Sequence, residues 1–374
     1  MNHNLDTTRS SFIMSLAKTA YGYLTLLIFL MISCSSNSQT DDQENGANPS
    51  NDDDKTFEIA IVPDTQYYTS QKHGGTTEMF SNQIEWITNN ALDNNIKYVI
   101  HLGDVVDHGH EQMAEWTIAK NIIYKLEKSL QGYPEGIPYG IAVGNHDQDP
   151  YGNPAGNSTL EGYNTYFGKS HFSGKSYYGG SFGENNDNHY GLFTAHSQKF
   201  IVLFIEYNEY GNEFYNSSIE NDVFKWGREV LNKYADHKAI IVSHSILARP
   251  DGSNSITRPG EGTNLIPSTF TDQGEKIYNA FKDSPNVFMM LSGHRSGEGF
   301  RIDTHNGKTI KSFLSDYQSR EDVSGNRNGG GALMRTMKFN LTKNTISVNT
   351  FAPTNSGFTS EIDEDSNFTI SLFD

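Results

Sequence analysis

The sequence predicts an α/β protein, because short apolar runs alternate along the chain with segments that carry a single apolar helical face. The apolar runs are rich in β-branched residues, which is typical of strands buried on both faces of a sheet. The alternation begins at Phe57 and continues to about residue 300. Polar residues with metal-binding side chains follow several of the runs directly, where strands of a parallel sheet would end.

Six strands and three helices are predicted in this alternating part. The predicted strands are residues 57–62, 97–102, 137–143, 199–205, 238–243 and 287–291. Each predicted helix places apolar side chains three or four positions apart, so that they share one face. These faces consist of Phe80, Ile84, Ile87 and Ala91, of Trp116, Ala119, Ile123, Leu126 and Leu130, and of Val223, Trp226, Val230 and Tyr234. We interpret all three faces as core packing rather than as ligand sites.

Beyond residue 300 the chain is predicted to be mainly strands. They cover residues 309–314, 333–341, 345–351 and 367–372. The pair Asn306-Gly307 favours a hairpin turn before the first of them. Two polar stretches, residues 148–190 and 248–272, interrupt the alternation. The first is rich in glycine, asparagine and aromatic residues and is long for an unstructured connection, so we expect it to carry function or to pack over the site.

The N-terminal residues resemble a bacterial lipoprotein signal. Lys18 precedes an apolar run at residues 23–32, and the run ends at Ser33 and Cys34. This run is too short to span a bilayer unaided and fits a cleaved signal peptide. We therefore expect residues 1–33 to be removed and Cys34 to be lipidated, which would anchor the protein to the outer membrane of the bacterial cell envelope. The alternative is an ordinary secretory signal in which the cysteine is incidental.

Residues 34–55 would then hold the lipidated cysteine and a polar, disordered linker, followed by a single domain of residues 56–374. The chain of 374 residues has a formal net charge of −17, and the predicted signal carries one net positive charge, which leaves −18 on the mature protein. Such an acidic surface repels phosphate backbones, so nucleic acid is disfavoured as a partner. A phosphorylated substrate would have to be attracted locally by metal ions.

Five short motifs follow predicted strands in a fixed order. They are Asp64-Thr65-Gln66, Gly103-Asp104, Gly144-Asn145-His146-Asp147, His244 and Gly293-His294. Carboxylate, amide and imidazole groups are ligands that divalent cations use in proteins. Because the carboxyl ends of parallel strands meet at one edge of a sheet, the five motifs are expected to converge there.

The order, spacing and residue types of these motifs resemble the calcineurin-like metallophosphoesterase superfamily. The resemblance implies a four-layer α-β-β-α sandwich that forms one domain, with the C-terminal strands in its second sheet. It also implies two divalent metal ions. The metal ligands implied are Asp64 and Gln66 for the first ion, Asp104 as a bridge between the ions, and Asn145, His244 and His294 for the second ion.

The same resemblance implies catalytic roles for His146 and Asp147. His146 would stabilise the transition state or protonate the leaving group, and Asp147 would hold its imidazole in one tautomer. Asp107 would support the loop by hydrogen bonds.

Two positions depart from the pattern of the superfamily. Gln66 and Ser296 stand where the family usually has histidines, and both missing imidazoles belong to the first ion. Their loss favours Mg²⁺, Ca²⁺ or Mn²⁺ over Zn²⁺ or Fe, and it predicts that the first ion binds weakly or not at all. The nearby histidines that could compensate are His73, His108, His110 and His305.

The predicted function is the hydrolysis of a phosphoester, on a phosphorylated small molecule or glycan, by a metal-activated hydroxide. Residues 148–190 would shape the leaving-group pocket. The alternative is a non-catalytic lipoprotein with a degraded first-metal site, in which the aromatic residues of this stretch form a platform for a glycan or another ligand. A nuclease is a third hypothesis, which the negative charge disfavours.

Overall fold

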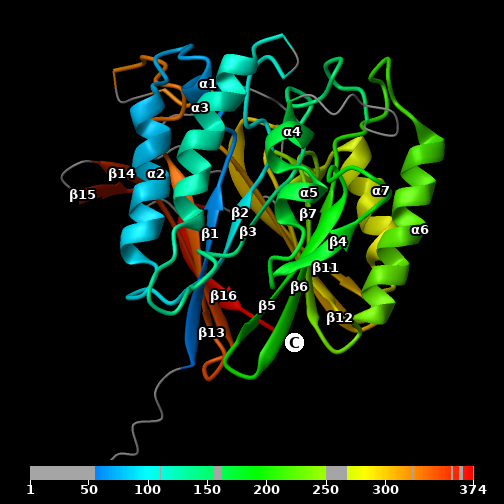
Figure 1. Cartoon of the computed structure of the whole chain (residues 1–374). Helices are drawn as coiled ribbons and strands as arrows, with labels where there is room; N and C mark the ends of the chain where they lie inside the picture. Colours follow the sequence, from blue (N-terminus) through cyan, green and yellow to red (C-terminus); the bar gives the residue numbers. More distant parts are fainter. Residues whose placement is uncertain are drawn as a thin grey trace, which may run out of the picture. The chain divides into compact units, whose positions relative to one another are not determined.

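Two mixed β-sheets lie face to face, with helices on both outer sides, as Figure 1 shows. The structure is a computed structural model and describes residues 55–109, 111–154, 162–249, 268–321, 324–354, 357–361 and 365–373. The predicted signal, Cys34 and almost all of the predicted linker lie outside these residues. The α-β-β-α architecture predicted above is confirmed.

One sheet, called the β1 sheet here, has seven strands among the described residues, in the order β15-β14-β13-β1-β2-β3, with β16 paired to β14. Its strands β1, β2 and β3 are parallel to one another, whereas β13 is antiparallel to β1. The strand bounds are β1 Thr56–Val62, β2 Ile96–His101, β3 Tyr139–Ile141, β13 Met334–Asn340, β14 Thr345–Thr354, β15 Gly357–Ser360 and β16 Asn367–Ser371.

The second sheet, called the β6 sheet, also has seven strands in the described part of the chain, in the order β11-β12-β10-β7-β6-β5-β4. The neighbouring strands from β6 through β7 and β10 to β12 are parallel. The bounds are β4 Tyr178–Ser181, β5 His189–Ala195, β6 Gln198–Ile205, β7 Lys238–Ser243, β10 Val287–Ser292, β11 Gly297–His305 and β12 Lys308–Asp316. A short separate pair consists of β8 Leu247–Ala248 and β9 Thr269–Phe270.

The apolar core follows the alternation of side chains along the strands. In β6, Phe200, Val202 and Phe204 belong to the cluster that fills the space between the sheets. Ile201, Leu203 and Ile205 point the other way and pack with α6 and α7. Successive side chains of a strand face opposite sides of the sheet, so an unbroken apolar run is required where both sides are covered.

Helices α2 and α3 cover the β1 sheet, and α6 and α7 cover the β6 sheet (Figure 1). The helix bounds are α1 Gln66–Thr69, α2 Thr77–Asn90, α3 Met113–Ile123, the 3₁₀ helix η1 Tyr124–Glu127, α4 Tyr163–Phe167, α5 Lys169–Phe172, α6 Ser217–Lys233 and α7 Asp272–Phe281. Helix α6 begins after Asn216, whose side chain accepts the free N–H groups of Ser218 and Ile219. None of the described helices is long and apolar enough to cross a membrane.

The C-terminal strands are divided between the sheets, which corrects the expectation that they all lie in one of them. Strand β12 continues the β6 sheet, whereas β13 to β16 extend the β1 sheet. The expected hairpin at Asn306 and Gly307 is confirmed, because it joins the antiparallel strands β11 and β12. Both turn residues have positive φ values, 52° and 76°, which the Asn-Gly pair tolerates.

A buried ion-pair network joins the two sheets. Arg335 of β13 is fully buried, and its Nη2 donates to Oε2 of Glu298 in β11 at 2.5 Å. Arg335 Nη1 also donates to the Leu314 carbonyl of β12. Glu298 accepts further bonds from the Tyr317 hydroxyl at 2.9 Å and from Arg320 at 3.1 Å. The network fixes the segment that follows β12 against both sheets.

Candidate metal centre

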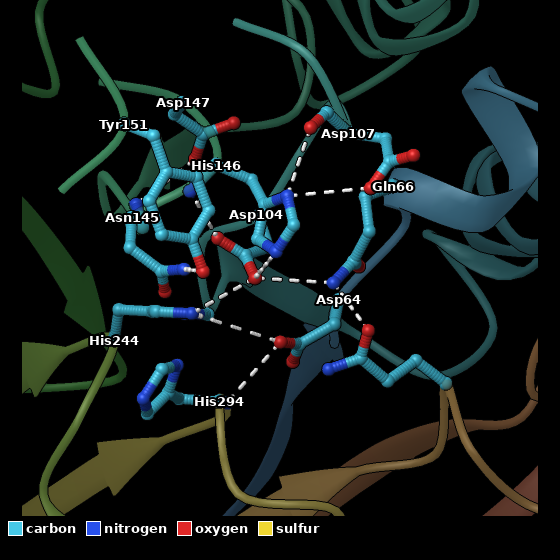
Figure 2. A network of polar contacts seen from close by, with 12 residues as sticks. Asp64, Gln66, Asp104, Asp107, Asn145, His146, Asp147, Tyr151, His244 and His294 are labelled. Carbon is cyan, nitrogen blue, oxygen red and sulfur yellow. Dashed lines mark hydrogen bonds and ion pairs between the residues drawn. The ribbon is translucent and has the colours of Figure 1, made fainter. Parts of the chain in front are cut away.

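The predicted metal ligands meet at one edge of the two sheets (Figure 2). The contributing residues are Asp64 after β1, Asp104 after β2, Asn145 after β3, His244 after β7 and His294 after β10. Backbone bonds tie the loops in pairs. Thr65 N–H donates to the Asp104 carbonyl at 3.0 Å, and Gly293 N–H donates to the His244 carbonyl at 3.1 Å. The strand-end positions read from the sequence therefore do converge.

Asp104 lies at the centre of the group. Its backbone is in the left-handed region, with φ at 50°. Gly144 packs so closely that a Cβ atom there would lie 2.2 Å from Asp104 Oδ1, so this position requires glycine. Oδ1 accepts the N–H of His146 and Oδ2 accepts Gln66 Nε2, both at 3.0 Å. Oδ2 also lies 3.2 Å from His244 Nε2, so Asp104 faces both predicted ion positions.

Asp104, His244 and His294 offer ligand atoms that lie within 4.8 Å of one another, at the predicted second-ion position. The Nδ1–H of His244 donates to the Leu102 carbonyl at 2.9 Å, which directs Nε2 towards the carboxylates. Burial opposes charge on the His244 ring, but the carboxylates of Asp104 and Asp64 raise the pKa of His244 to about 10. The two carboxylates therefore favour a positive charge at this position.

The His294 ring is held by Glu209, which the sequence analysis did not identify. His294 Nε2 lies 3.5 Å from Glu209 Oε2, and Arg295 Nη2 lies 3.2 Å from Glu209 Oε1. Burial lowers the pKa of His294 to about 4, which leaves its ring neutral, as a metal ligand must be. Burial also acts on Glu209, but its contacts with His294 and Arg295 lower the pKa of Glu209 to about 2. A carboxylate behind a ligand histidine orients the ring.

Four side-chain atoms of the predicted ligands are buried without a hydrogen-bond partner in the described structure. They are Asp64 Oδ2, Gln66 Oε1, Asn145 Oδ1 and His244 Nε2. Buried polar atoms are normally paired, because an unpaired one costs free energy. Three oxygen atoms and one imidazole nitrogen form a donor set that suits divalent cations. The residues present therefore fit the metal ions that the motifs predict.

Asp316 and Gln318 lie on the side of Asp64 and Gln66, and the sequence analysis missed both. Gln66 Nε2 donates to Gln318 Oε1 as well as to Asp104. Burial first, and the charge of Asp316 second, raise the pKa of Asp64 well above its usual range. Burial raises the pKa of Asp316 to about 6. The available signal was that Asp316 closely follows the predicted strand 309–314, as the recognised ligands closely follow theirs.

The histidines considered as compensating ligands have other partners where the structure describes them. His108 Nδ1 contacts Glu115 Oε1 at 3.0 Å, and His305 Nε2 contacts Asp283 at 2.7 Å. The His73 ring packs on Tyr67, and His110 is outside the described residues. Ser296 is buried just before β11, whose first residue pairs with Asp316.

Asp107 and Asp147 have the reverse of their expected contacts. The Asp147 carboxylate accepts the backbone N–H groups of Val105, Val106 and Gly144, at 2.8, 3.2 and 2.9 Å. The His146 ring instead contacts Asp107, with Nδ1 2.8 Å from the carbonyl oxygen and 3.3 Å from Oδ1. Asp147 therefore supports the loops after β2 and β3, and Asp107 holds the imidazole, because the Asp147 carboxylate is taken up by backbone donors of those loops.

His146 is the exposed member of the group, with 24% of its side chain accessible. Its Nε2 lies 4.0 Å from Asp104 Oδ2. Burial favours the neutral ring, but Asp104 and the bonds to Asp107 raise the pKa of His146 to about 9. The position at the open side of the ligands is the one expected for a group that meets substrate.

His101, another residue that the motifs did not reveal, lies beneath the loops of Asp64 and Asp104. Its Nδ1 accepts the Gly103 N–H at 3.2 Å, so Nε2 carries the proton and donates to Thr65 Oγ1 at 3.0 Å. Thr65 Oγ1 in turn donates to the Val105 carbonyl. Burial lowers the pKa of His101 to about 3, and the neutral ring joins two ligand loops.

The stretch 148–190 supplies one aromatic residue to the site. Tyr151 is 51% exposed, its hydroxyl accepts Asn145 Nδ2 at 2.5 Å, and its ring packs edge-on against His146 at 4.7 Å. Most other aromatic residues described in the stretch are buried in the core, including Tyr163, Phe167, Phe172 and Tyr177. Those buried rings are not available as a surface platform for a ligand.

Comparisons with known proteins place the chain in a family. Residues 57–318 match the sequence profile of the calcineurin-like phosphoesterases. The uncharacterized protein YvnB of Bacillus subtilis (strain 168) is 31% identical over 306 residues, which are 79% of this chain and 20% of that protein. The chain thus spans about a fifth of the length of this relative.

Two solved structures are similar in part. GAP50, the anchor in the inner membrane complex of Plasmodium, has a TM-score of 0.47 at 12% identity, covering 85% of this chain and 89% of that one. A dimetal phosphatase from Danio rerio has a TM-score of 0.47 at 13% identity, covering 84% of this chain and 99% of that one. The profile match extends from β1 to just past β12, and with it the chain belongs to the calcineurin-like phosphoesterase family.

Proposed function

We propose that this protein hydrolyses a phosphoester at a site that holds two divalent metal ions. The observation that carries the proposal is the set of buried, unpaired ligand atoms on Asp64, Gln66, Asn145 and His244, which meet around Asp104. Membership of the phosphoesterase family implies a phosphorylated substrate in general.

Each ion would have its own ligands, and Asp104 would be shared. The second ion would be bound by Asn145, His244 and His294, and the first by Asp64 and Gln66. Two divalent ions at these positions supply a water-derived nucleophile at neutral pH and offset negative charge on the phosphoryl group. The oxygen-rich first position favours Mg²⁺, Mn²⁺ or Ca²⁺.

The side chains around the ions have distinct tasks. His146 donates a proton to the leaving oxygen, and Asp107 holds the ring in place through Nδ1. Tyr151, whose ring packs on His146 and is half exposed, lines the side by which the leaving group departs. Glu209 and His101 hold ligand loops and rings and do not touch substrate.

We further propose that the protein works outside the cytoplasm, anchored to the outer membrane of a bacterial envelope through lipidated Cys34. The support for this location is the apolar run that ends at Ser33 and Cys34. The substrate class that fits is a phosphorylated small molecule or glycan, since the chain is strongly acidic.

Activity and metal content of the purified full chain test the proposed hydrolysis. We expect nitrophenyl phosphate, or its diester, to be hydrolysed when Mn²⁺ is added. Asp104→Asn should lose metal and activity together, whereas His146→Ala should keep its metal and lose about 10²–10⁴-fold in kcat. A wild type that binds two ions and hydrolyses neither ester would contradict the proposal. Equal metal loss in both variants would show that His146 is a ligand instead.

A further inference from the structure

Asp316 lies at the same edge of the sheets as the recognised ligands. It is the last residue of β12, which runs parallel to β10 with Ser292 opposite Leu314. The two strands therefore end at nearly the same level, and β10 leads directly to His294. The Asp316 side chain is fully buried. Its position in the sheet is equivalent to that of the strand-end ligands.

A chain of hydrogen bonds connects Asp316 to the bridging residue Asp104. Asp316 Oδ1 and Oδ2 accept the backbone N–H and Nε2 of Gln318, both at 3.0 Å. Gln318 Oε1 accepts Gln66 Nε2, which also donates to Asp104 Oδ2. Both protons of the Gln66 amide are therefore engaged by acceptors, and Gln66 Oε1 is left buried and unpaired.

Three buried carboxylates, those of Asp64, Asp104 and Asp316, are thus linked at this edge. Asp64 and Asp104 both approach His244 Nε2, and Gln66 and Gln318 connect Asp104 to Asp316. In the described part of the chain, no lysine or arginine forms an ion pair with any of them; the ion pairs found for Asp64 and Asp104 involve only histidines. Asp64 Oδ2 has no hydrogen-bond partner. Buried charges are normally paired or bound to a metal, and no ion pair is found for Asp316 among the described residues.

We propose that Asp316 is a ligand of the first metal ion and replaces the imidazoles that are missing at positions 66 and 296. The first position then has oxygen ligands from Asp64, Asp104 and Asp316, with Gln66 Oε1 nearby. Gln318 orients the new ligand, and Tyr317, whose hydroxyl bonds to Glu298, fixes the backbone between them. An all-oxygen site selects Mg²⁺, Mn²⁺ or Ca²⁺ over Zn²⁺. The inference rests on the proposed two-ion site, and it replaces the expectation of a weak first ion.

Metal binding to the full chain, measured without any substrate, tests the inference. Wild type and variants are stripped with chelator, titrated with Mn²⁺ alone, and followed by electron paramagnetic resonance and elemental analysis. We expect two ions in the wild type and one in Asp316→Asn. Gln318→Ala, which removes only an orienting group, should keep two ions with about 10–100-fold weaker binding of one. Asp187→Asn changes an equally buried aspartate elsewhere and should bind two ions as the wild type does.

The ligand role also predicts selectivity. Asp316→His should restore an imidazole and increase the affinity for Zn²⁺ relative to Mn²⁺ at one of the two positions. Melting curves in chelator show whether each variant is folded, and Asp316→Ser takes the place of any variant that is not. Two ions bound with unchanged affinity in Asp316→Asn would overturn the inference and leave the proposed hydrolysis intact. A wild type that binds two ions without hydrolysing phosphoesters would overturn only the proposed function.

Discussion

At the scale of single residues, the site shows how side chains of the same type take different tasks. Asp104, Asp107 and Asp147 all lie in loops at the end of β2 and β3, and their neighbours decide what each can do. Asp104 meets ligand histidines, Asp107 meets the His146 ring, and Asp147 accepts three backbone N–H groups. Spacing in the sequence located this group of carboxylates but could not say which of them holds the imidazole, because that depends on the turn geometry after β3.

The division of tasks between Asp107 and Asp147 leads to opposite effects of the same substitution. Asp147→Asn places an amide against backbone donors and should lower the free energy of unfolding by about 1–3 kcal/mol. Asp107→Asn removes an ion pair with the half-exposed Lys72 and should cost less than about 1 kcal/mol. In Asp107→Asn the kcat should fall, but by less than it falls when the imidazole is removed in His146→Ala. Urea unfolding and kinetics on both variants check this, and a stability loss confined to Asp107→Asn would refute it.

A second residue-scale prediction concerns His189, which is buried in β5 and stacks on Phe204 at 4.4 Å. Burial lowers the pKa of His189 to about 3, although its bond to the Asn186 carbonyl acts in the other direction. The unfolded chain takes up the proton below about pH 6.5, and the folded chain does not until about pH 3. This group therefore makes the protein less stable as the pH falls through that window, by up to about 1.4 kcal/mol per pH unit.

Replacement of His189 by leucine removes this loss of stability at low pH. The free energy of unfolding of His189→Leu, relative to wild type, should improve steadily between pH 6 and pH 4 when both are measured by urea unfolding in chelator. A difference between the two proteins that does not change with pH would show that the folded protein binds the proton as readily as the unfolded chain.

At the scale of elements, the sequence was sufficient for the strands that carry apolar runs and for helices α2 and α6. It missed α7, and the helical face predicted to reach Leu130 ends earlier, with α3 at Ile123 and η1 at Glu127. The face of Phe80, Ile84 and Ile87 is buried in α2, and the run 238–243 is β7. The sequence did not show to which of the two sheets each strand belongs. A hairpin signal at Asn306 and Gly307 shows that β12 is antiparallel to β11, but not that it lies parallel to β10. Asp316 was overlooked for that reason, since only the parallel alignment brings its carboxylate to the metal edge.

The two sheets are joined by the buried contact between Arg335 and Glu298. Replacement of Arg335 by methionine leaves Glu298 buried with only one of its two arginines, and we expect a loss of about 3–5 kcal/mol in unfolding free energy. Arg301→Ala serves as the control, because Arg301 pairs with Asp303 of the same strand near the surface and should cost less than about 1 kcal/mol. Similar losses in both variants would mean that the contact between the sheets contributes no more than a surface pair.

At the scale of the whole molecule, a phosphoesterase domain follows residues for which the sequence predicts a lipoprotein signal and a linker. The residues that the structure describes belong almost entirely to the domain. The anchor can be tested by substitution of Cys34 with serine, which should release the protein from the membrane fraction while the enzyme remains active. The measurement is fractionation of cells together with labelling by a fatty acid. A Cys34→Ser variant that loses its signal peptide and still sediments with membranes would contradict the anchor.

The order of the ligands along the chain decides at what stage of its synthesis the protein can bind metal ions. The first ligand, Asp64, and the proposed last one, Asp316, are 252 residues apart, and strands of two sheets must be in place between them. A growing chain that has left the ribosome only as far as β10 still lacks β12 and also β13, the antiparallel neighbour of β1. With Asp316 as the proposed ligand, a fragment that ends before β12 would lack part of the first-ion position, so we expect complete metal binding only after β12 has been made.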